Sequence, residues 1–204
     1  MFDRIATYWL ASSLALLVSA AAQPAFAAAH EGFYLRGQAG IGGARAWTEI
    51  GRLDVEYSGG AGALNLEVGG SLNKRWALFG KLYGLFVPEL DYDIEGFDGD
   101  TETGGFIRGI GIGTQHFFPT NFYLGGALTL SVIGTREDGE QFYDSDPGPM
   151  AHLTFGKEWW VARETAIGLG AEFALGGFPD DDLDDDGFTW GGGFAVLYFS
   201  ATYN

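Results

Sequence analysis

Three histidines and a few hydroxyl side chains are the residues of this sequence that could support catalysis. The sequence has no cysteine, which excludes a thiolate nucleophile and a thiolate metal site. His30 falls in the N-terminal region and His116 has the spacing of an apolar face, so His152 is the best candidate for a general base. With Glu172 as the orienting acid and Ser131 as the nucleophile it would complete a triad, but only strand topology suggests their proximity.

Two acidic segments could bind divalent cations through carboxylate oxygens. Segments 88–105 and 178–187 are rich in Asp and Glu and contain no Lys or Arg. Residues 182–187 have the Asp-x-Asp-x-Asp-Gly opening of a calcium loop, yet Gly193 stands where an EF-hand requires glutamate. An EF-hand is therefore excluded, and weak Ca²⁺ or Mg²⁺ binding remains as an expectation beside ordinary solvated charge. The candidate ligands are Asp98, Asp100, Asp180, Asp182, Asp184 and Asp186.

The overall charge limits the classes of partner. Lys and Arg number 11 and Asp and Glu number 27, which gives a net charge of −16. A nucleic-acid-binding protein needs a basic surface to neutralise phosphates, and this composition argues against one. No cofactor is expected apart from the possible weak Ca²⁺.

The N-terminal residues have the pattern of a secretory signal peptide. Arg4 precedes an apolar stretch over 10–22, and small residues then offer cleavage after Ala27 or Ala29. The apolar stretch is shorter than the roughly 20 residues of a membrane-spanning helix. We therefore expect a signal peptide over 1–27 and a single mature domain over 30–204.

The mature part shows a repeated two-residue alternation, which is typical of β-strands with one apolar face. In segment 62–72, leucine and valine occupy one parity, and asparagine, glutamate, glycine and serine occupy the other. Arg108 interrupts the apolar parity of its own segment near one end. The expected strands cover 33–43, 62–72, 76–87, 106–116, 123–134, 150–158, 165–176 and 188–203.

The connections between these segments alternate in length. Those at 73–75, 118–121 and 161–164 are short, while those at 44–61, 88–105, 135–149 and 178–187 are long and polar. Outer-membrane barrels have short periplasmic turns and long extracellular loops, with aromatic residues at the membrane interfaces. Bulky aromatic side chains beside the short turns are accordingly interpreted as an interfacial girdle: Trp76, Phe117, Phe118, Phe122, Trp159 and Trp160.

The two faces of the strands favour a membrane barrel over a soluble barrel of the lipocalin type. The bulky apolar parity carries almost no charge in mid-strand, as a lipid-facing surface requires. The other parity holds glycine, alanine and a few charged groups, which suit the narrow interior of an eight-stranded barrel. The predicted fold is an all-β, eight-stranded antiparallel up-and-down transmembrane β-barrel.

Charged residues of the inward parity are expected to pair inside the barrel. Counting from the turn at 73–75 puts Glu67 opposite Lys81, and counting from 161–164 brings His152 near Glu172. Arg36 adds a further inward cation. Buried charges need partners, so the simplest interpretation is a set of paired and hydrogen-bonded charges that closes a narrow lumen.

The sequence resembles the family of small outer-membrane β-barrel proteins typified by the transmembrane domain of outer membrane protein A. The resemblance covers nearly all of the mature part, and the motifs that carry it are Gly-Phe-Tyr-Leu-Arg-Gly at 32–37, Gly-Lys-Glu-Trp-Trp-Val at 156–161 and the terminal Phe-Ser-Ala-Thr-Tyr-Asn at 199–204. It implies insertion by the barrel-assembly machinery and contact with outer-membrane lipid and lipopolysaccharide. Members usually end on an aromatic residue, whereas Asn204 follows Tyr203 here.

The sequence thus predicts an integral protein of the cell outer membrane, monomeric and without enzymatic activity, that has a structural or surface-interaction role. The alternative is a narrow passive channel for small solutes, similar to the outer membrane protein W family. An outer-membrane lipid-modifying enzyme is a distant third, because only the weak triad of His152, Glu172 and Ser131 supports it.

Overall fold

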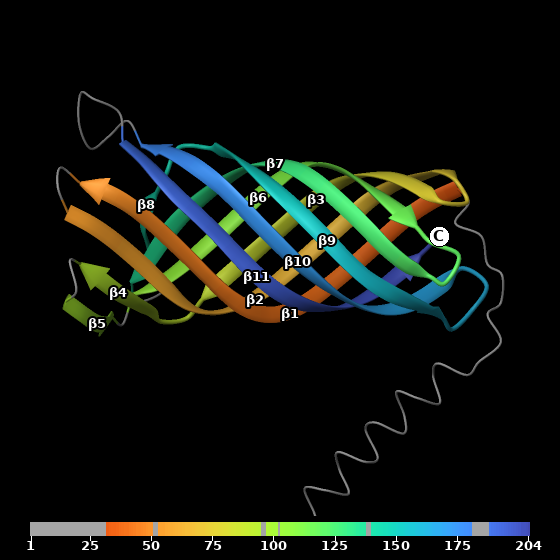
Figure 1. The fold of residues 1–204 in the computed structure, drawn as a ribbon, viewed down its shortest axis with the longest axis horizontal. Helices are drawn as coiled ribbons and strands as arrows, with labels where there is room; N and C mark the ends of the chain where they lie inside the picture. Colours follow the sequence, from red (N-terminus) through yellow and green to blue (C-terminus); the bar gives the residue numbers. More distant parts are fainter. Residues whose placement is uncertain (1–31, 51–52, 95–96, 102, 138–139, 181–187) are drawn as a thin grey trace, which may run out of the picture.

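The computed structural model describes residues 32–50, 53–94, 97–101, 103–137, 140–180 and 188–204. Eight long strands form a barrel, and three short strands extend it at one end (Figure 1). The barrel strands are β1 (Gly32–Ile50), β2 (Leu53–Asn73), β3 (Trp76–Val87), β6 (Gly104–Phe117), β7 (Phe122–Glu137), β9 (Gly148–Trp160), β10 (Thr165–Asp180) and β11 (Phe188–Tyr203). The short strands are β4 (Leu90–Ile94), β5 (Phe97–Thr101) and β8 (Glu140–Asp144).

The sheet closes on itself because β1 is hydrogen-bonded on both sides. Leu35 lies opposite Val68 of β2 and also opposite Tyr203 of β11, and every pairing around the barrel is antiparallel. Closure satisfies the backbone groups that an open sheet would leave unpaired at its edges. The predicted fold class, an eight-stranded antiparallel up-and-down barrel, is confirmed.

The three short connections also agree with the prediction. In the β2–β3 turn, Asn73 Oδ1 accepts hydrogen bonds from the backbone N–H groups of Arg75 and Trp76, at 2.9 and 3.1 Å. In the β6–β7 turn, Asn121 adopts a positive φ of 60°, a conformation that asparagine tolerates better than most residues. These side chains make each reversal possible within a few residues.

The long connections contain more strand than the sequence pattern indicated. Segment 44–61, expected to be a loop, belongs mostly to a hairpin in which β1 and β2 remain paired up to Ile50 and Leu53. Outside the apolar part of the barrel both faces of a strand can be polar. The alternation of apolar and polar residues therefore ends there, although the hydrogen bonds between the strands continue. Strands β4, β5 and β8 lie at this end, opposite the C-terminus (Figure 1).

The outer surface is apolar along the middle of the barrel. Leu64, Ile112 and Leu128 are 67%, 69% and 67% exposed, although side chains of this type are normally buried in water-soluble proteins. The inward side chains of the same strands include Asn65 and Thr129, both buried. This arrangement, apolar outside and polar inside, is the reverse of a soluble lipocalin-like barrel and requires surrounding lipid.

The described residues contain no helix that is long and apolar enough to cross a membrane.

The barrel interior has three layers along its axis. Aromatic residues including Tyr34, Phe117 and Tyr123 pack near the short-turn end, and charged and amide side chains occupy the middle. Near the long-loop end the interior becomes apolar, with Ile107 and Phe178 among the buried residues. The polar layer and the apolar mouth above it are the two parts of the candidate site.

Candidate functional site

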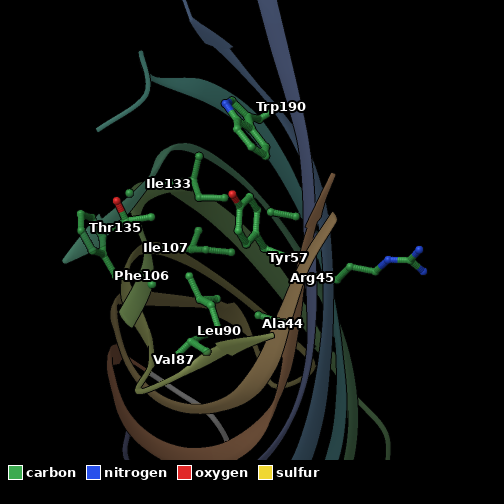
Figure 2. Close-up of a pocket in the computed structure, with 13 residues that line it drawn as sticks. Ala44, Arg45, Tyr57, Val87, Leu90, Phe106, Ile107, Ile133, Thr135 and Trp190 are labelled. Atoms are coloured by element: carbon green, nitrogen blue, oxygen red, sulfur yellow. The ribbon is translucent and has the colours of Figure 1, made fainter. Parts of the chain in front are cut away.

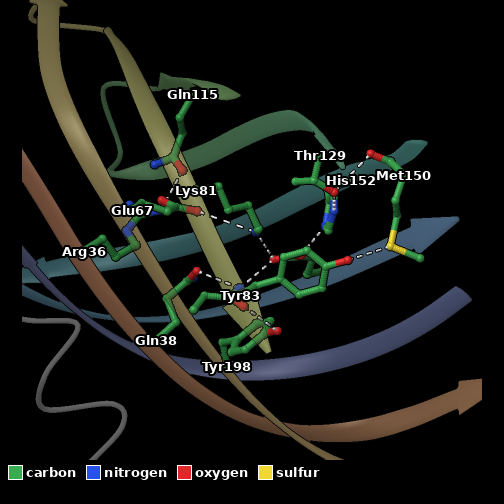
Figure 3. Close-up of polar contacts among 12 residues, drawn as sticks. Arg36, Gln38, Glu67, Lys81, Tyr83, Gln115, Thr129, Met150, His152 and Tyr198 are labelled. Carbon is green, nitrogen blue, oxygen red and sulfur yellow. Dashed lines mark hydrogen bonds and ion pairs between the residues drawn. The ribbon is translucent and has the colours of Figure 1, made fainter. Parts of the chain in front are cut away.

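Arg36 contacts several polar side chains in the part of the polar layer nearest the short turns, among them Gln115 (Figure 3). Its guanidinium donates to Glu158 Oε1 and to Gln115 Oε1, both at 2.6 Å, and its Nε donates to Thr202 Oγ1 at 3.0 Å. These partners come from β9, β6 and β11, whereas Arg36 lies on β1. Arg36 and Glu158 are almost fully buried, and their ion pair joins two strands that are not neighbours in the sheet.

Aromatic rings surround the Arg36 guanidinium. Its central carbon lies 4.4 Å from the ring centroid of Tyr123, 5.4 Å from that of Tyr34 and 5.9 Å from that of Phe117. The negative faces of such rings attract a cation, and the attraction is stronger when water is excluded. The rings therefore fill the short-turn end of the lumen around a fixed charge.

Glu67 links the two cations of the network. It lies directly opposite Lys81 in the β2–β3 register, as the sequence predicted, and its Oε1 is 3.9 Å from Lys81 Nζ. Its Oε2 accepts a hydrogen bond from Tyr34 at 2.8 Å and lies 3.6 Å from Arg36 Nη1. Lys81 makes its shorter contact elsewhere, because Nζ lies 2.8 Å from Glu172 Oε2 across the lumen.

A chain of hydrogen bonds continues from Glu172 toward the mouth. His152 Nδ1 lies 2.7 Å from Glu172 Oε1, and His152 Nε2 lies 2.9 Å from Thr129 Oγ1. Thr129 in turn contacts Ser131 Oγ at 2.8 Å, so the threonine stands between the histidine and the serine. The triad weighed from the sequence is thus not formed through Ser131, and the hydroxyl at the imidazole belongs to Thr129.

Tyr83 covers the hydroxyl groups of Thr129 and Ser131 on the side of the mouth. Tyr83 donates to Ser131 Oγ at 2.8 Å and contacts Met150 Sδ at 3.0 Å, and its ring packs edge-on against His152 at a centroid distance of 4.8 Å. All of these side chains are buried. A nucleophile must be reachable by its substrate, so this arrangement is a packed core and lacks the access that the enzyme interpretation needs.

Together these contacts form a plug across the lumen. Two basic side chains, Arg36 and Lys81, face three acidic ones, Glu67, Glu158 and Glu172, and His152 contacts the last of them. Buried charges are tolerated only when paired and hydrogen-bonded, and the pairing here runs from wall to wall (Figure 3). The side chains of both basic residues and all three carboxylates are at most 1% exposed.

The five lumen residues singled out in the sequence, Arg36, Glu67, Lys81, His152 and Glu172, all point into this network. Sequence reasoning missed Glu158, Gln115 and Asn65, which donate to or accept from them. Glu158 has the same parity as His152 on β9, and that spacing was the available signal.

The aromatic girdle requires a correction. Trp76, Phe118 and Phe122 are exposed on the outer surface and Trp159 is half-buried, whereas Phe117 and Trp160 are 2% and 8% exposed and point into the interior. Adjacent residues on a strand face opposite sides, so the pairs 117–118 and 159–160 could not both face lipid. Phe117 instead belongs to the aromatic layer around Arg36.

The acidic candidate ligands lie outside the described residues: Asp182, Asp184 and Asp186 altogether, and Asp98, Asp100 and Asp180 by their side chains. Among the side chains that are described, no group of three or more His, Asp or Glu is arranged to hold a metal ion.

Above the plug, the mouth of the barrel contains an apolar pocket of about 230 Å³ (Figure 2). Tyr57, Leu90, Ile107, Ile133 and Trp190 line it, together with smaller side chains such as Ala44 and Ala46. Tyr57 and Trp190 pack with their ring centroids 6.0 Å apart. In Figure 2 Arg45 points away from the other lining residues, so its charge is directed out of the pocket.

Comparisons with known proteins agree on the fold. No protein-family model matches the sequence. No curated protein matches it either. Among solved structures, neisserial surface protein A superposes with a TM-score of 0.53 at 15% identity, covering 84% of this chain and 96% of the other. OprG, an outer membrane protein from Pseudomonas aeruginosa, gives a TM-score of 0.49 at 9% identity, with 86% and 98% covered.

A third similar structure is Ail of Yersinia pestis in complex with the heparin analogue sucrose octasulfate. It has a TM-score of 0.39 and 12% identity, with 81% of this chain and 98% of the other covered. At these identities the likeness concerns the fold alone. The closed barrel with its apolar outer surface is that of a small outer-membrane protein, and its place is the bacterial outer membrane.

Proposed function

We propose that this outer-membrane barrel does not conduct solutes and acts at the cell surface, where its mouth binds an apolar group of a partner. The observation that supports the proposal most strongly is the order of the layers along the barrel axis. A paired ionic plug runs from Arg36 to Glu172, and an apolar pocket lies directly above it, on the side of the long loops. A pocket with a closed floor holds a group and does not pass it on.

The size of the pocket limits the group that it holds. Pockets for whole drug-sized ligands measure roughly 300–1,000 Å³, whereas this one measures about 230 Å³. It therefore suits a single large side chain or a short hydrocarbon segment of a larger partner. Burial of such a group against Ile107, Ile133 and Trp190 supplies the binding free energy, because apolar area leaves water.

The charge around the mouth limits the partner further. Asp91 and Asp93 are exposed on β4 at the long-loop end. The sequence predicts that the acidic segments 88–105 and 178–187 belong to this same end of the barrel. A strongly anionic partner would be repelled. The proposed partner is therefore neutral or cationic near the contact, with an apolar group that enters the mouth.

Indole tests this pocket, because it is apolar, water-soluble and about the size of a tryptophan side chain. In lipid nanodiscs containing protein labelled at its isoleucine methyl groups, we expect indole to shift the signals of Ile107 and Ile133 saturably. Ile110 and Ile112 lie on β6 beside Ile107 but face lipid, 64% and 69% exposed. Their signals report the indole that merely dissolves in the bilayer, and should change linearly.

Filling the pocket provides the control. Ala46 lines it and is buried, so Ala46→Phe should abolish the saturable shifts while the lipid-facing signals still respond. Saturable shifts that persist in this variant, or inward signals that follow the lipid-facing ones, would refute binding at the mouth.

The channel interpretation finds less support in this geometry, since any solute would have to displace the buried pairs of the plug. Conductance in planar bilayers distinguishes a channel from a closed barrel.

A further inference from the structure

Two arginines stand on the outer surface of the barrel, near the long-loop end. Arg108 of β6 and Arg136 of β7 have the outward parity, and Arg108 lies two residues from the lipid-facing Ile110. Among the described residues at this end of the barrel, one other basic side chain lies outside the lumen. It is Arg45, which forms an ion pair with Glu56. An outward cation on a transmembrane strand is costly near the bilayer centre but not at the headgroup level.

Both guanidinium groups converge on one aromatic ring. Their central carbons lie 5.0 and 5.1 Å from the ring centroid of Phe106, which also has the outward parity but is only 6% exposed. Asp144 Oδ2 accepts a hydrogen bond from Arg108 at 3.0 Å, which fixes that side chain further. Asp144 balances one of the two positive charges, and an anion bound by both guanidinium groups would balance the charge that is left.

An apolar groove of about 550 Å³ runs along the outer surface from these arginines. Leu64 and Phe86 form its sides, and Gly62 and Gly84 leave its floor low, with open space where a side chain would stand. The residues that line the groove include both arginines and no acidic side chain. A cationic end and an apolar track match a molecule with a phosphate group and a hydrocarbon chain.

We propose that this groove is a binding site for lipid A, the phosphorylated glycolipid of the outer leaflet. One phosphate lies between Arg108 and Arg136, where guanidinium groups can donate paired hydrogen bonds, and one acyl chain lies over Gly62 and Gly84. The position of the arginines at the long-loop end selects the outer leaflet. The groove shares Phe106 and Ile107 with the lining of the mouth pocket, whereas both arginines and both glycines of the proposed site line the groove alone.

The test measures binding of bisphosphorylated lipid A by native mass spectrometry of the mature protein in zwitterionic micelles. We expect wild type to retain one lipid A saturably. Arg108→Gln/Arg136→Gln should weaken this binding at least about tenfold, since each charge-assisted hydrogen bond is worth about a factor of ten or more. Gly84→Leu should weaken it similarly by filling the groove, and the open space around Gly84 lets the variant fold.

Two matched variants control for general effects. Arg45→Gln removes a cation from the same end outside the groove, and Gly37→Leu adds a leucine to an equally open position on the outer surface. Both should bind lipid A as wild type does. Equal binding of dephosphorylated lipid A or of phosphatidylglycerol, or unchanged binding in the double arginine and Gly84 variants, would overturn the assignment.

Discussion

Replacing Lys81 with methionine is expected to destabilise the barrel by about 3–5 kcal/mol, the cost of leaving a buried charge without its partner. Lys81 Nζ lies 2.8 Å from Glu172 and 3.9 Å from Glu67, and all three side chains are at most 1% exposed. Methionine fills a similar volume, so the lost stability comes from removal of the charge and not from a cavity. Urea unfolding of the protein in lipid vesicles measures the effect.

A second substitution separates the partners of Lys81. In Lys81→Met/Glu172→Leu the shorter ion pair is removed as a unit, and part of the lost stability should return. Lys81→Met/Glu67→Leu should recover less, because Glu67 retains Tyr34 and Arg36 as partners. This order reverses the emphasis of the sequence alone, which singled out Glu67 as the main partner.

Lys74→Met serves as the control, since Lys74 is exposed in the β2–β3 turn and its loss should cost less than about 1 kcal/mol. If Lys81→Met and Lys74→Met unfold at the same urea concentration, the lysine at position 81 is not buried among carboxylates.

The second large effect concerns the outer surface. Leu128→Arg should reduce stability by about 2–4 kcal/mol, the cost of an arginine facing lipid at the bilayer midplane. Leu128 is 67% exposed and lies in the middle of β7, beside Ile112 of β6. The heat-modifiable gel shift of folded barrels and urea unfolding in vesicles measure assembly and stability together.

Depth provides the matched control. Phe118→Arg places the same charge on the same outer surface at the short-turn end, where the expected cost falls to about 0–1 kcal/mol. Equal stability of the two arginine variants would mean that the surface around Leu128 does not face the bilayer core.

The strand pattern was the most predictable part of the fold, for a physical reason. Lipid admits only apolar side chains on the outer face, so a two-residue alternation had to appear wherever a strand crosses the bilayer. The same constraint ends at the headgroups. The hairpin extension of β1 and β2 and the short strands β4, β5 and β8 were accordingly not visible in the sequence.

Partners across the lumen were harder to predict than partners across a turn. Glu67 and Lys81 could be paired by counting from their turn, and the register agrees. Arg36 and Glu158 are 122 positions apart on strands that are not neighbours, so only the curvature of the closed barrel brings them together. Thr129 and Ser131 are two residues apart on one strand and face the same side, so parity alone could not show which of them contacts His152. In the structure that residue is Thr129.

Conductance of the mature protein in planar lipid bilayers shows whether the lumen of the barrel is closed. We expect no single-channel steps under an applied voltage, because the paired side chains of Arg36, Glu67, Lys81, Glu158 and Glu172 are buried across the lumen. Folded protein must be confirmed in the same sample by its gel shift. Regular steps of uniform size from folded wild-type protein would contradict the plug and favour a channel.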